Sequence, residues 1–321
     1  IIHNDKIVVD QPSIVAIDRK TDKVKAVGDR AMLMHEKTHA DIKTIRPLKD
    51  GVIADFHAAE IMIREMIKMI YEGKRKPLFP PSYKMVICIP SGITEVEKRA
   101  VKDSAENSGG KEVKMIHEPM AAAIGIGIDV EEPSGNMIID IGGGTTEIAV
   151  ISLSGIVGDQ SIRIAGDEFT ANIVNYMRRQ HNMMIGERTA EKIKINIGAA
   201  LTELENPPED YPVNGRDLMT GIPKQIIVTY SEVAHAIDKS ISKIEEAILK
   251  ALETTPPELA ADIYKTGLYL TGGGALLRGL DKRISAKTKL PVHVADDPLR
   301  AVVRGTGIAL KKMDQFTFLM D

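Results

Sequence analysis

The sequence of 321 residues is long enough for two domains, or for two lobes with a cleft, and its 43% hydrophobic and 27% charged residues are ordinary for a globular protein. A net charge of −3 without a long basic block argues against nucleic acid as a partner. The one cysteine, Cys88, excludes an internal disulfide and favours a reducing compartment, and no apolar run is long enough to span a bilayer.

The first part of the chain predicts a β-meander followed by a helix. Three strand-like runs are separated by turns: Lys6–Val9, Ile14–Ile17 and Lys23–Val27. Residues 31–49 are mixed and basic, without a clear period. Asp55 is an N-cap candidate, and apolar residues recur at helical spacing from there to Tyr71.

The loop after this helix carries two large apolar residues, Leu78 and Phe79, among lysines, arginine and prolines. Large apolar side chains are out of place in such a loop. The residues alone leave two interpretations open. The pair folds back onto its own lobe, or it forms a tip that inserts into a membrane.

Strands and helices then alternate. Met85–Ile89 predicts a buried strand, and a capping box of Thr94 and Glu97 begins a helix. After the strand Val113–Ile116, Glu118 stands at the predicted N-cap of an alanine-rich helix, before a proline. Ser, Thr, Asp or Asn is preferred at an N-cap, so Glu118 is either a mediocre cap or a functional residue.

A glycine-rich turn at the centre of the chain is the main candidate for a ligand site. The β-branched runs of Met137–Ser152 flank Gly142, Gly143, Gly144 and Thr145. This strand–turn–strand differs from a Walker loop, which leads into a helix. The glycines can adopt positive φ and direct successive N–H groups at a phosphate. Asp140, at the end of the first strand, is placed to hold a metal ion through water. An ordinary hairpin turn is the alternative.

The chain continues with a strand over Gly155–Ile164, a helix capped by Gly166 and Asp167, and a helix over Thr189–Ile197. Glu187, Glu191 and Lys194 lie near the start of that second helix, and by themselves they indicate a solvated face. Residues 206–221 are rich in proline and glycine and predict a loop, after which Ser231 caps a long amphipathic helix.

A second run of three glycines, Gly272, Gly273 and Gly274, follows the strand Gly267–Leu270 and leads into a predicted helix. Such a junction exposes backbone to a ligand. Two glycine runs so far apart in the chain suggest one ligand held between two loops.

The motif order, Asp-Ile-Gly-Gly-Gly-Thr-Thr followed by Leu-Thr-Gly-Gly-Gly-Ala, resembles the actin and DnaK-type ATPase superfamily, and within it the MreB family of bacterial actins. Further stretches that look like this family are residues 45–56, 89–100, 117–125, 215–223 and 295–299. The resemblance covers essentially the whole chain.

This resemblance implies an α/β, actin-like fold of two lobes, each with a ribonuclease-H-like mixed sheet flanked by helices, divided into four subdomains. The implied boundaries are residues 1–15 and 51–133 for subdomain IA, with 307–321 returning to it; 16–50 for IB; 134–161 and 231–306 for IIA; and 162–230 for IIB.

The resemblance also implies a nucleotide, ATP or ADP, with Mg²⁺ in a cleft between the lobes. It assigns Gly142, Gly143, Gly144 and Thr145 to the phosphates, Asp140 to the Mg²⁺ shell, and Glu118 and Thr145 to the attacking water. It assigns Glu191 to the ribose, Lys194 to the neighbourhood of the base, and Gly273, Gly274, Ala275 and Leu276 to the adenosine side. Gly166 and Gly272 are further nucleotide-binding residues. Positioned water and charge neutralisation are what phosphoryl transfer requires.

The implied function is a filament-forming ATPase of the cytoskeleton that organises cell-wall synthesis and rod shape. Its expected partners are other copies of the chain, in filaments and protofilament pairs, anionic lipid through Leu78 and Phe79, and membrane-bound wall-synthesis proteins. It would be cytoplasmic, at the inner-membrane surface. The alternatives are an actin-fold sugar or acetate kinase, for which no separate catalytic base is evident, and a DnaK-type chaperone ATPase, which would carry a further β-rich domain.

One feature of the family has no counterpart before Ile1. Its members begin with a hairpin, Asp-Leu-Gly-Thr-Ala-Asn-Thr, that holds the first phosphate loop. We therefore expect the chain as given to lack half of the phosphate clamp and to be inactive as an ATPase by itself.

Overall fold

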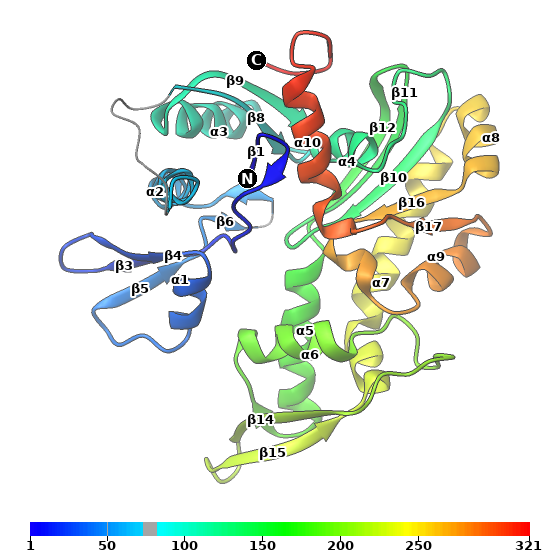
Figure 1. Cartoon of the computed structure of the whole chain (residues 1–321). Helices are drawn as coiled ribbons and strands as arrows, with labels where there is room; N and C mark the ends of the chain where they lie inside the picture. Colours follow the sequence, from blue (N-terminus) through cyan, green and yellow to red (C-terminus); the bar gives the residue numbers. More distant parts are fainter. Residues whose placement is uncertain (50, 73–81) are drawn as a thin grey trace. The chain divides into compact units, whose positions relative to one another are not determined.

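The computed structural model describes residues 1–49, 51–72 and 82–321. These residues form two compact units, of which the first comprises residues 1–127 and 302–321 and the second comprises residues 128–301. Figure 1 labels the elements of both units. Leu78 and Phe79 lie outside the described residues.

The first unit contains short sheets and helices. Its elements are β1 (Ile2–His3), β2 (Lys6–Ile7), β3 (Val15–Asp18), β4 (Val24–Val27), α1 (Asp29–Met34), β5 (Ile42–Ile45), β6 (Leu48–Lys49), β7 (Val52–Ile53), α2 (Phe56–Met69), β8 (Tyr83–Ile89), α3 (Glu95–Asn107), β9 (Gly110–His117), α4 (Glu118–Gly125) and α10 (Ala301–Lys311). A three-stranded sheet has the order β4-β3-β5, and β8 pairs with β9 in parallel. The C-terminal segment returns to this unit, where Met320 bridges Met115 of β9.

The second unit is built on a mixed five-stranded sheet of order β12-β11-β10-β16-β17. These strands are β10 (Asn136–Ile141), β11 (Thr146–Ser152), β12 (Gly155–Ile162), β16 (Leu268–Thr271) and β17 (Val292–Val294). β10, β11 and β12 are antiparallel, and β16 and β17 continue in parallel from β10. Every residue of β10 and β11 is buried, as expected for strands that are covered on both faces.

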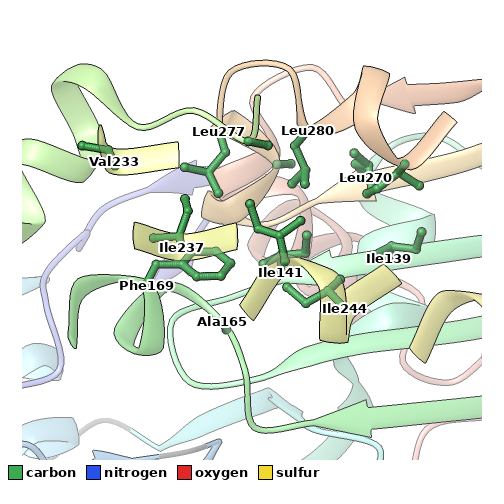
Figure 2. Packing of buried hydrophobic residues seen from close by; sticks show 14 of the residues in the cluster. Ile139, Ile141, Ala165, Phe169, Val233, Ile237, Ile244, Leu270, Leu277 and Leu280 are labelled. Atoms are coloured by element: carbon green, nitrogen blue, oxygen red, sulfur yellow. The ribbon is translucent and has the colours of Figure 1, made fainter. Parts of the chain in front are cut away.

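The helices of the second unit are α5 (Gly166–Gln180), α6 (Glu187–Ile197), α7 (Tyr230–Glu253), α8 (Pro257–Thr266) and α9 (Leu280–Thr288), with 3₁₀ turns η1 (Gly273–Leu276) and η2 (Pro298–Arg300). Figure 2 shows how Ile139 and Ile141 of β10 share one core with Phe169 of α5 and Ile237 of α7. A second, smaller sheet has the order β13-β14-β15, from β13 (Met183–Met184), β14 (Tyr211–Asp217) and β15 (Pro223–Val228).

Several predicted boundaries and element types are wrong. Residues 206–221 are not all loop, since β14 lies within them. Residues 31–49, for which the sequence predicts no element, contain part of α1 together with β5 and β6. The long helix is capped by Thr229 rather than Ser231, because the Thr229 hydroxyl and the Glu232 carboxylate form a capping box. The second glycine run leads into the 3₁₀ turn η1 instead of an α-helix. The predicted cap at Asp55 and the capping box of Thr94 and Glu97 are confirmed.

Candidate functional site

The turn between β10 and β11 is held by backbone hydrogen bonds. Gly142 N–H donates to Thr145 O at 2.9 Å within the turn. The first residues of α5 then donate to the turn, Gly166 N–H to Gly142 O at 3.1 Å and Asp167 N–H to Gly143 O at 2.7 Å. The glycine turn is therefore fixed against the N-terminus of a 15-residue helix, the end at which a helix favours negative charge.

The sequence-based explanation of the three glycines, positive φ angles, is wrong. None of Gly142, Gly143 and Gly144 adopts a positive φ. What distinguishes Gly143 is the space around it. It is exposed, and the nearest atom that a Cβ there would meet is Asp167 Oδ2 at 4.0 Å. Protein packing therefore gives no reason for the missing side chain, whereas the close approach of a ligand to the backbone does.

Asp140 is the second-last residue of β10, beside this turn, and its carboxyl group is buried. Its Oδ1 and the Thr271 hydroxyl oxygen make no hydrogen bond to any described residue. Burial raises the pKa of Asp140 to about 6; the nearby Thr271 hydroxyl opposes this shift and the Glu147 carboxylate adds to it. A buried carboxylate oxygen without a partner fits a cation, and one or two carboxylates are what Mg²⁺ takes from a protein when phosphates supply the rest.

The next group of site residues lies where α6 packs on α5 (Figure 1). Lys194 Nζ donates to Gly166 O at 2.8 Å and to Thr170 Oγ1 at 3.1 Å, and it pairs with Glu191 Oε2 at 2.7 Å. The Thr170 hydroxyl lies 2.7 Å from the same Glu191 oxygen. Gly166 thus links two parts of the site, because its N–H holds the glycine turn and its carbonyl is held by Lys194.

The second glycine run lies beside the end of β10. Gly272 has φ of +78°, and a Cβ there would approach Asp140 Oδ1 and Ile141 O to 2.4 Å each. A Cβ on Gly274 would approach Ile141 Cγ2 to 2.2 Å. Close packing on β10 therefore explains these two glycines without a ligand. Ala275 is buried as well, while Leu276 is 54% exposed.

Glu118 belongs to the first unit, where the structure corrects its expected place in the helix. His117 is the N-cap of α4, Glu118 is its first residue, and Pro119 follows within the first turn. An acid in the first turn of a helix is favourable, so Glu118 is no exception to the capping rules. The capping argument for a functional role of Glu118 is therefore lost. Glu118 is half-buried.

The second unit therefore brings together most of the predicted site residues. They are Asp140, Gly142, Gly143, Gly144, Thr145, Gly166, Glu191, Lys194, Gly272, Gly273, Gly274, Ala275 and Leu276. The sequence interpretation missed Thr170, Thr271 and the contribution of Asp167. A helix over 166–180 puts Thr170 one turn after Gly166, but nothing local predicts its contact with Glu191.

Residues 1–49, 51–72 and 82–321, which the structure describes, contain neither a membrane-spanning helix nor a cluster of metal ligands. No helix there is long and apolar enough to cross a membrane. No group of three or more His, Cys, Asp and Glu side chains there is arranged to hold a metal ion. A site with a single protein carboxylate, as at Asp140, requires no such group.

Comparison with known proteins gives consistent matches over the whole chain. The family model described as "MreB/Mbl protein" matches residues 1–317. The cell shape-determining protein Mbl of Bacillus subtilis (strain 168) is 47% identical over 309 residues, which cover 96% of this chain and 91% of the relative. The cell shape-determining protein MreB of Escherichia coli (strain K12) is 47% identical over 312 residues, covering 96% and 88%.

Among solved structures, MreB5 of Spiroplasma citri bound to AMPPNP matches with a TM-score of 0.90 at 38% identity, over 97% of this chain and 92% of that one. The ADP-bound form of the same protein matches equally well. A MamK double helical filament matches with a TM-score of 0.74 at 21% identity, over 94% and 91% of the two chains. The predicted actin-like fold is thereby confirmed.

Proposed function

The chain belongs to the MreB/Mbl family, and from this premise we propose that it is a nucleotide-dependent, actin-like filament protein that maintains rod cell shape by organising cell-wall synthesis. ATP hydrolysis is coupled to polymer dynamics. The partners are other copies of the chain, in filaments and protofilament pairs, and membrane-bound cell-shape and wall-synthesis proteins at the cytoplasmic face of the inner membrane. The four-subdomain division given above is part of this proposal.

The observation that carries the nucleotide proposal is the turn at Gly143. An exposed glycine, whose Cβ would meet no protein atom nearer than Asp167 Oδ2 at 4.0 Å, lies against the N-terminus of α5, beside a buried carboxylate oxygen without a partner. Backbone without a side chain, the positive end of a helix dipole and a cation ligand are together suited to a phosphate chain with its metal. The structural relatives bound to AMPPNP and ADP support the same assignment.

The proposal assigns tasks to the individual site residues. Gly142, Gly143, Gly144 and Thr145 contact phosphates, Glu191 accepts hydrogen bonds from the ribose, and Lys194 lies near the base. Gly273, Gly274, Ala275 and Leu276 line the adenosine side, and Gly166 and Gly272 are further nucleotide-binding residues. Asp140 holds the Mg²⁺ shell, and the cation, when bound, neutralises phosphate charge. Glu118 and Thr145 orient the attacking water, with Glu118 accepting its proton. The Lys194 ammonium already contacts Gly166, Thr170 and Glu191, so its contact with the base is secondary to holding α5 and α6 together.

We extend the proposal to Leu78 and Phe79 as a membrane contact. The argument is one of sequence, since both lie outside the described residues. Burying one Leu and one Phe contributes roughly 3–6 kcal/mol, and each neighbouring basic residue about 1 kcal/mol against anionic lipid. Association entropy leaves a single subunit weakly bound, but a filament repeats the contact many times. Polymers should therefore co-sediment with anionic vesicles while monomers barely do. Replacing both residues by serine should abolish this without stopping polymerisation, and filaments of the double variant that still co-sediment would remove the membrane role.

Negative-stain microscopy of the full-length protein with ATP and Mg²⁺ tests the central proposal. We expect filaments with ATP and few without nucleotide. The second candidate, an actin-fold small-molecule kinase, would stay dispersed and transfer phosphate to an added sugar or to acetate. A DnaK-type chaperone would likewise stay dispersed, with hydrolysis stimulated by unfolded peptide. Dispersed protein at all nucleotide concentrations would contradict the filament proposal.

A further inference from the structure

Thr170 is buried in α5 at the centre of the contacts between α5 and α6, only 6% exposed. Its Oγ1 lies 2.9 Å from Gly166 O, 2.7 Å from Glu191 Oε2 and 3.1 Å from Lys194 Nζ. A threonine in a helix often donates to the carbonyl four residues earlier, which here is Gly166. The contact with Glu191 has no such local origin, because it joins two helices across 21 residues of chain.

The hydroxyl has one proton to donate and two acceptors within reach. Gly166 O already accepts a hydrogen bond from the Lys194 ammonium at 2.8 Å. Glu191 Oε2 is the closer acceptor and carries negative charge, so a bond to it is shorter and stronger than one to a neutral carbonyl. Lys194 in turn donates to the lone pairs of Thr170 Oγ1. The Thr170 proton therefore goes to Glu191.

The two carboxylate oxygens of Glu191 differ in their contacts. Both the Thr170 hydroxyl and the Lys194 ammonium contact Oε2. Oε1 takes part in neither contact, and the Glu191 side chain is 42% exposed. One oxygen is thus anchored to the protein and sets the plane of the carboxylate, and the other remains available to a ligand.

From these contacts we infer that Thr170 is a positioning residue that makes the site selective for a ribose with its hydroxyl groups. Anchoring Oε2 leaves Oε1 as a pre-oriented acceptor for a ribose hydroxyl. This inference rests on the proposed function, in which Glu191 binds the ribose. It adds a second residue, with no ligand contact of its own, that decides how strongly ribose is distinguished from a sugar lacking its hydroxyls.

The test compares ATP with 2′,3′-dideoxy-ATP, which lacks both ribose hydroxyls, on the full-length protein with Mg²⁺. Isothermal titration gives the two dissociation constants for wild type, Thr170→Val, Thr170→Ser and Glu191→Ala. Valine keeps the shape and the β-branch of threonine but removes the hydroxyl. Serine keeps the hydroxyl and is the matched control. Thermal melting of each variant verifies that it is folded.

We expect wild type and Thr170→Ser to bind ATP about tenfold or more tighter than the dideoxy nucleotide, the size of a hydrogen bond to a charged acceptor. In Thr170→Val this ratio should fall to about two, with affinity for the dideoxy nucleotide unchanged within about twofold. Glu191→Ala should lose the discrimination as well. Adding Thr170→Val to Glu191→Ala should leave the ratio unchanged, because the two residues then act through one contact.

Three outcomes would overturn the inference. If Thr170→Val weakens both nucleotides equally, the hydroxyl has only a structural role. If Thr170→Val leaves both dissociation constants at their wild-type values, Glu191 is oriented without the Thr170 hydroxyl. A wild type that binds ATP but does not distinguish it from the dideoxy nucleotide removes the ribose role of Glu191 and with it that of Thr170. A wild type that binds neither nucleotide contradicts the proposed function itself.

Discussion

Gly143 and Gly272 lack a side chain for different reasons: at Gly143 a ligand would occupy the space, and at Gly272 the protein itself does. Stability and nucleotide binding of alanine variants distinguish the two reasons. A Cβ on Gly143 would meet no protein atom nearer than 4.0 Å, whereas one on Gly272 would reach 2.4 Å from both Asp140 and the backbone of Ile141. Gly143→Ala should therefore change the free energy of unfolding by less than about 0.5 kcal/mol. It should weaken Mg·ATP binding at least tenfold, because its methyl group occupies the ligand's space.

Gly272→Ala is the matched counterpart. Its φ of +78° and ψ of 172° lie in a backbone region that is essentially confined to glycine, which alone costs alanine about 1–3 kcal/mol, and the close contacts add to this. Urea unfolding and nucleotide titration of both variants separate the two cases. A Gly143→Ala protein that binds Mg·ATP normally would show that no ligand approaches this turn.

Asp140 gives the metal-free protein a dependence of stability on pH. Its pKa is raised from 3.8 to about 6, mainly by burial, so the folded state disfavours its ionised form. The contribution of Asp140 to stability is therefore highest below pH 3.8, the pKa in the unfolded chain, and it is lost as the pH rises through 6. Above pH 6 the loss is on the order of 3 kcal/mol.

Asp140→Asn should accordingly unfold at higher urea concentration than wild type at pH 7.5 without metal, and at the same concentration near pH 4. The same change should weaken Mg²⁺-dependent nucleotide binding, since it removes the anionic oxygen. Asp159→Asn, at an exposed position on β12, serves as the control. Equal stability of Asp140→Asn and wild type at both pH values would mean that the buried carboxylate is already compensated.

At the residue scale, the sequence points to those parts of the candidate site that are contiguous in the chain. Asp140, the glycines after it and Thr145 can be interpreted from one strand–turn–strand pattern. Thr170 could not be found in this way, because its role depends on the packing of α6 against α5. The sequence also could not predict why each position is a glycine, since this depends on which atoms lie where a Cβ would be.

The hairpin of β14 and β15 offers a test at the scale of one element. Asp217 at its turn accepts hydrogen bonds from the N–H groups of Met219 and Thr220, at 2.8 and 3.0 Å, and pairs with Lys224 at 2.7 Å. Lys224 also donates to His181 O at 3.0 Å, which ties the hairpin to the end of α5. The Lys224 ammonium, followed by the two backbone N–H groups, holds the pKa of Asp217 well below its usual range.

A depressed pKa means that the stabilisation is present above the unfolded value of 3.8 and is lost as the pH falls below it. Asp217→Asn keeps the turn acceptor but loses the ion pair, and Asp217→Ala loses both. Hydrogen-exchange protection of the 217–224 segment at pH 7 should fall in the order wild type, Asn, Ala. The difference between wild type and Asn should begin to shrink as the pH falls below 3.8 and should vanish only as the pH falls through the depressed pKa of the folded state; it should also shrink in high salt. An exchange difference that is independent of pH and salt would exclude the ion pair as its cause.

At the element scale, capping signals and apolar periods predicted well where a local rule decides the structure. Asp55 and the Thr94–Glu97 box begin helices as expected. β14 was missed because Pro212 and Gly215 argue against a strand. The glycine is explained by close packing, since a Cβ on Gly215 would approach Met184 O to 2.6 Å. Pro212 lies on the face of β14 whose residues are exposed.

At the scale of the whole molecule, composition predicted only two lobes, and the fold followed from the resemblance. The return of the C-terminal segment to the first unit depends on contacts between distant residues. α10 packs so closely on α4 that a Cβ on Gly305 would lie 1.7 Å from Ala121 O. Arg304 Nε also donates to Gly125 O at 3.2 Å. Small residues in a C-terminal helix are compatible with many partners, so the sequence alone does not select α4.

The last prediction separates assembly from hydrolysis in the proposed filament. Head-to-tail contacts that do not close into a ring give open polymers, which form above a critical concentration. If hydrolysis is coupled to assembly, phosphate release per subunit should rise sharply above that concentration, whereas a kinase would turn over at a constant rate per molecule. Glu118→Ala should polymerise at a critical concentration within about twofold of wild type, since ATP is still bound. Its phosphate release should fall on the order of a hundredfold, as for loss of a general base.

Glu95→Ala is the matched control for this experiment. Glu95 is also a first-turn acid, at the start of α3, so its removal causes a similar loss of helix-dipole stabilisation, together with an exposed ion pair to Lys98 at 2.8 Å, without any role for the water. Light scattering, phosphate release and thermal melting on the full-length variants give the three quantities. If Glu118→Ala and Glu95→Ala both lose a few tenths of a kcal/mol in stability and both release phosphate at the wild-type rate, Glu118 acts only on its helix. Slow release in Glu118→Ala alone, with filaments intact, would assign it to the water.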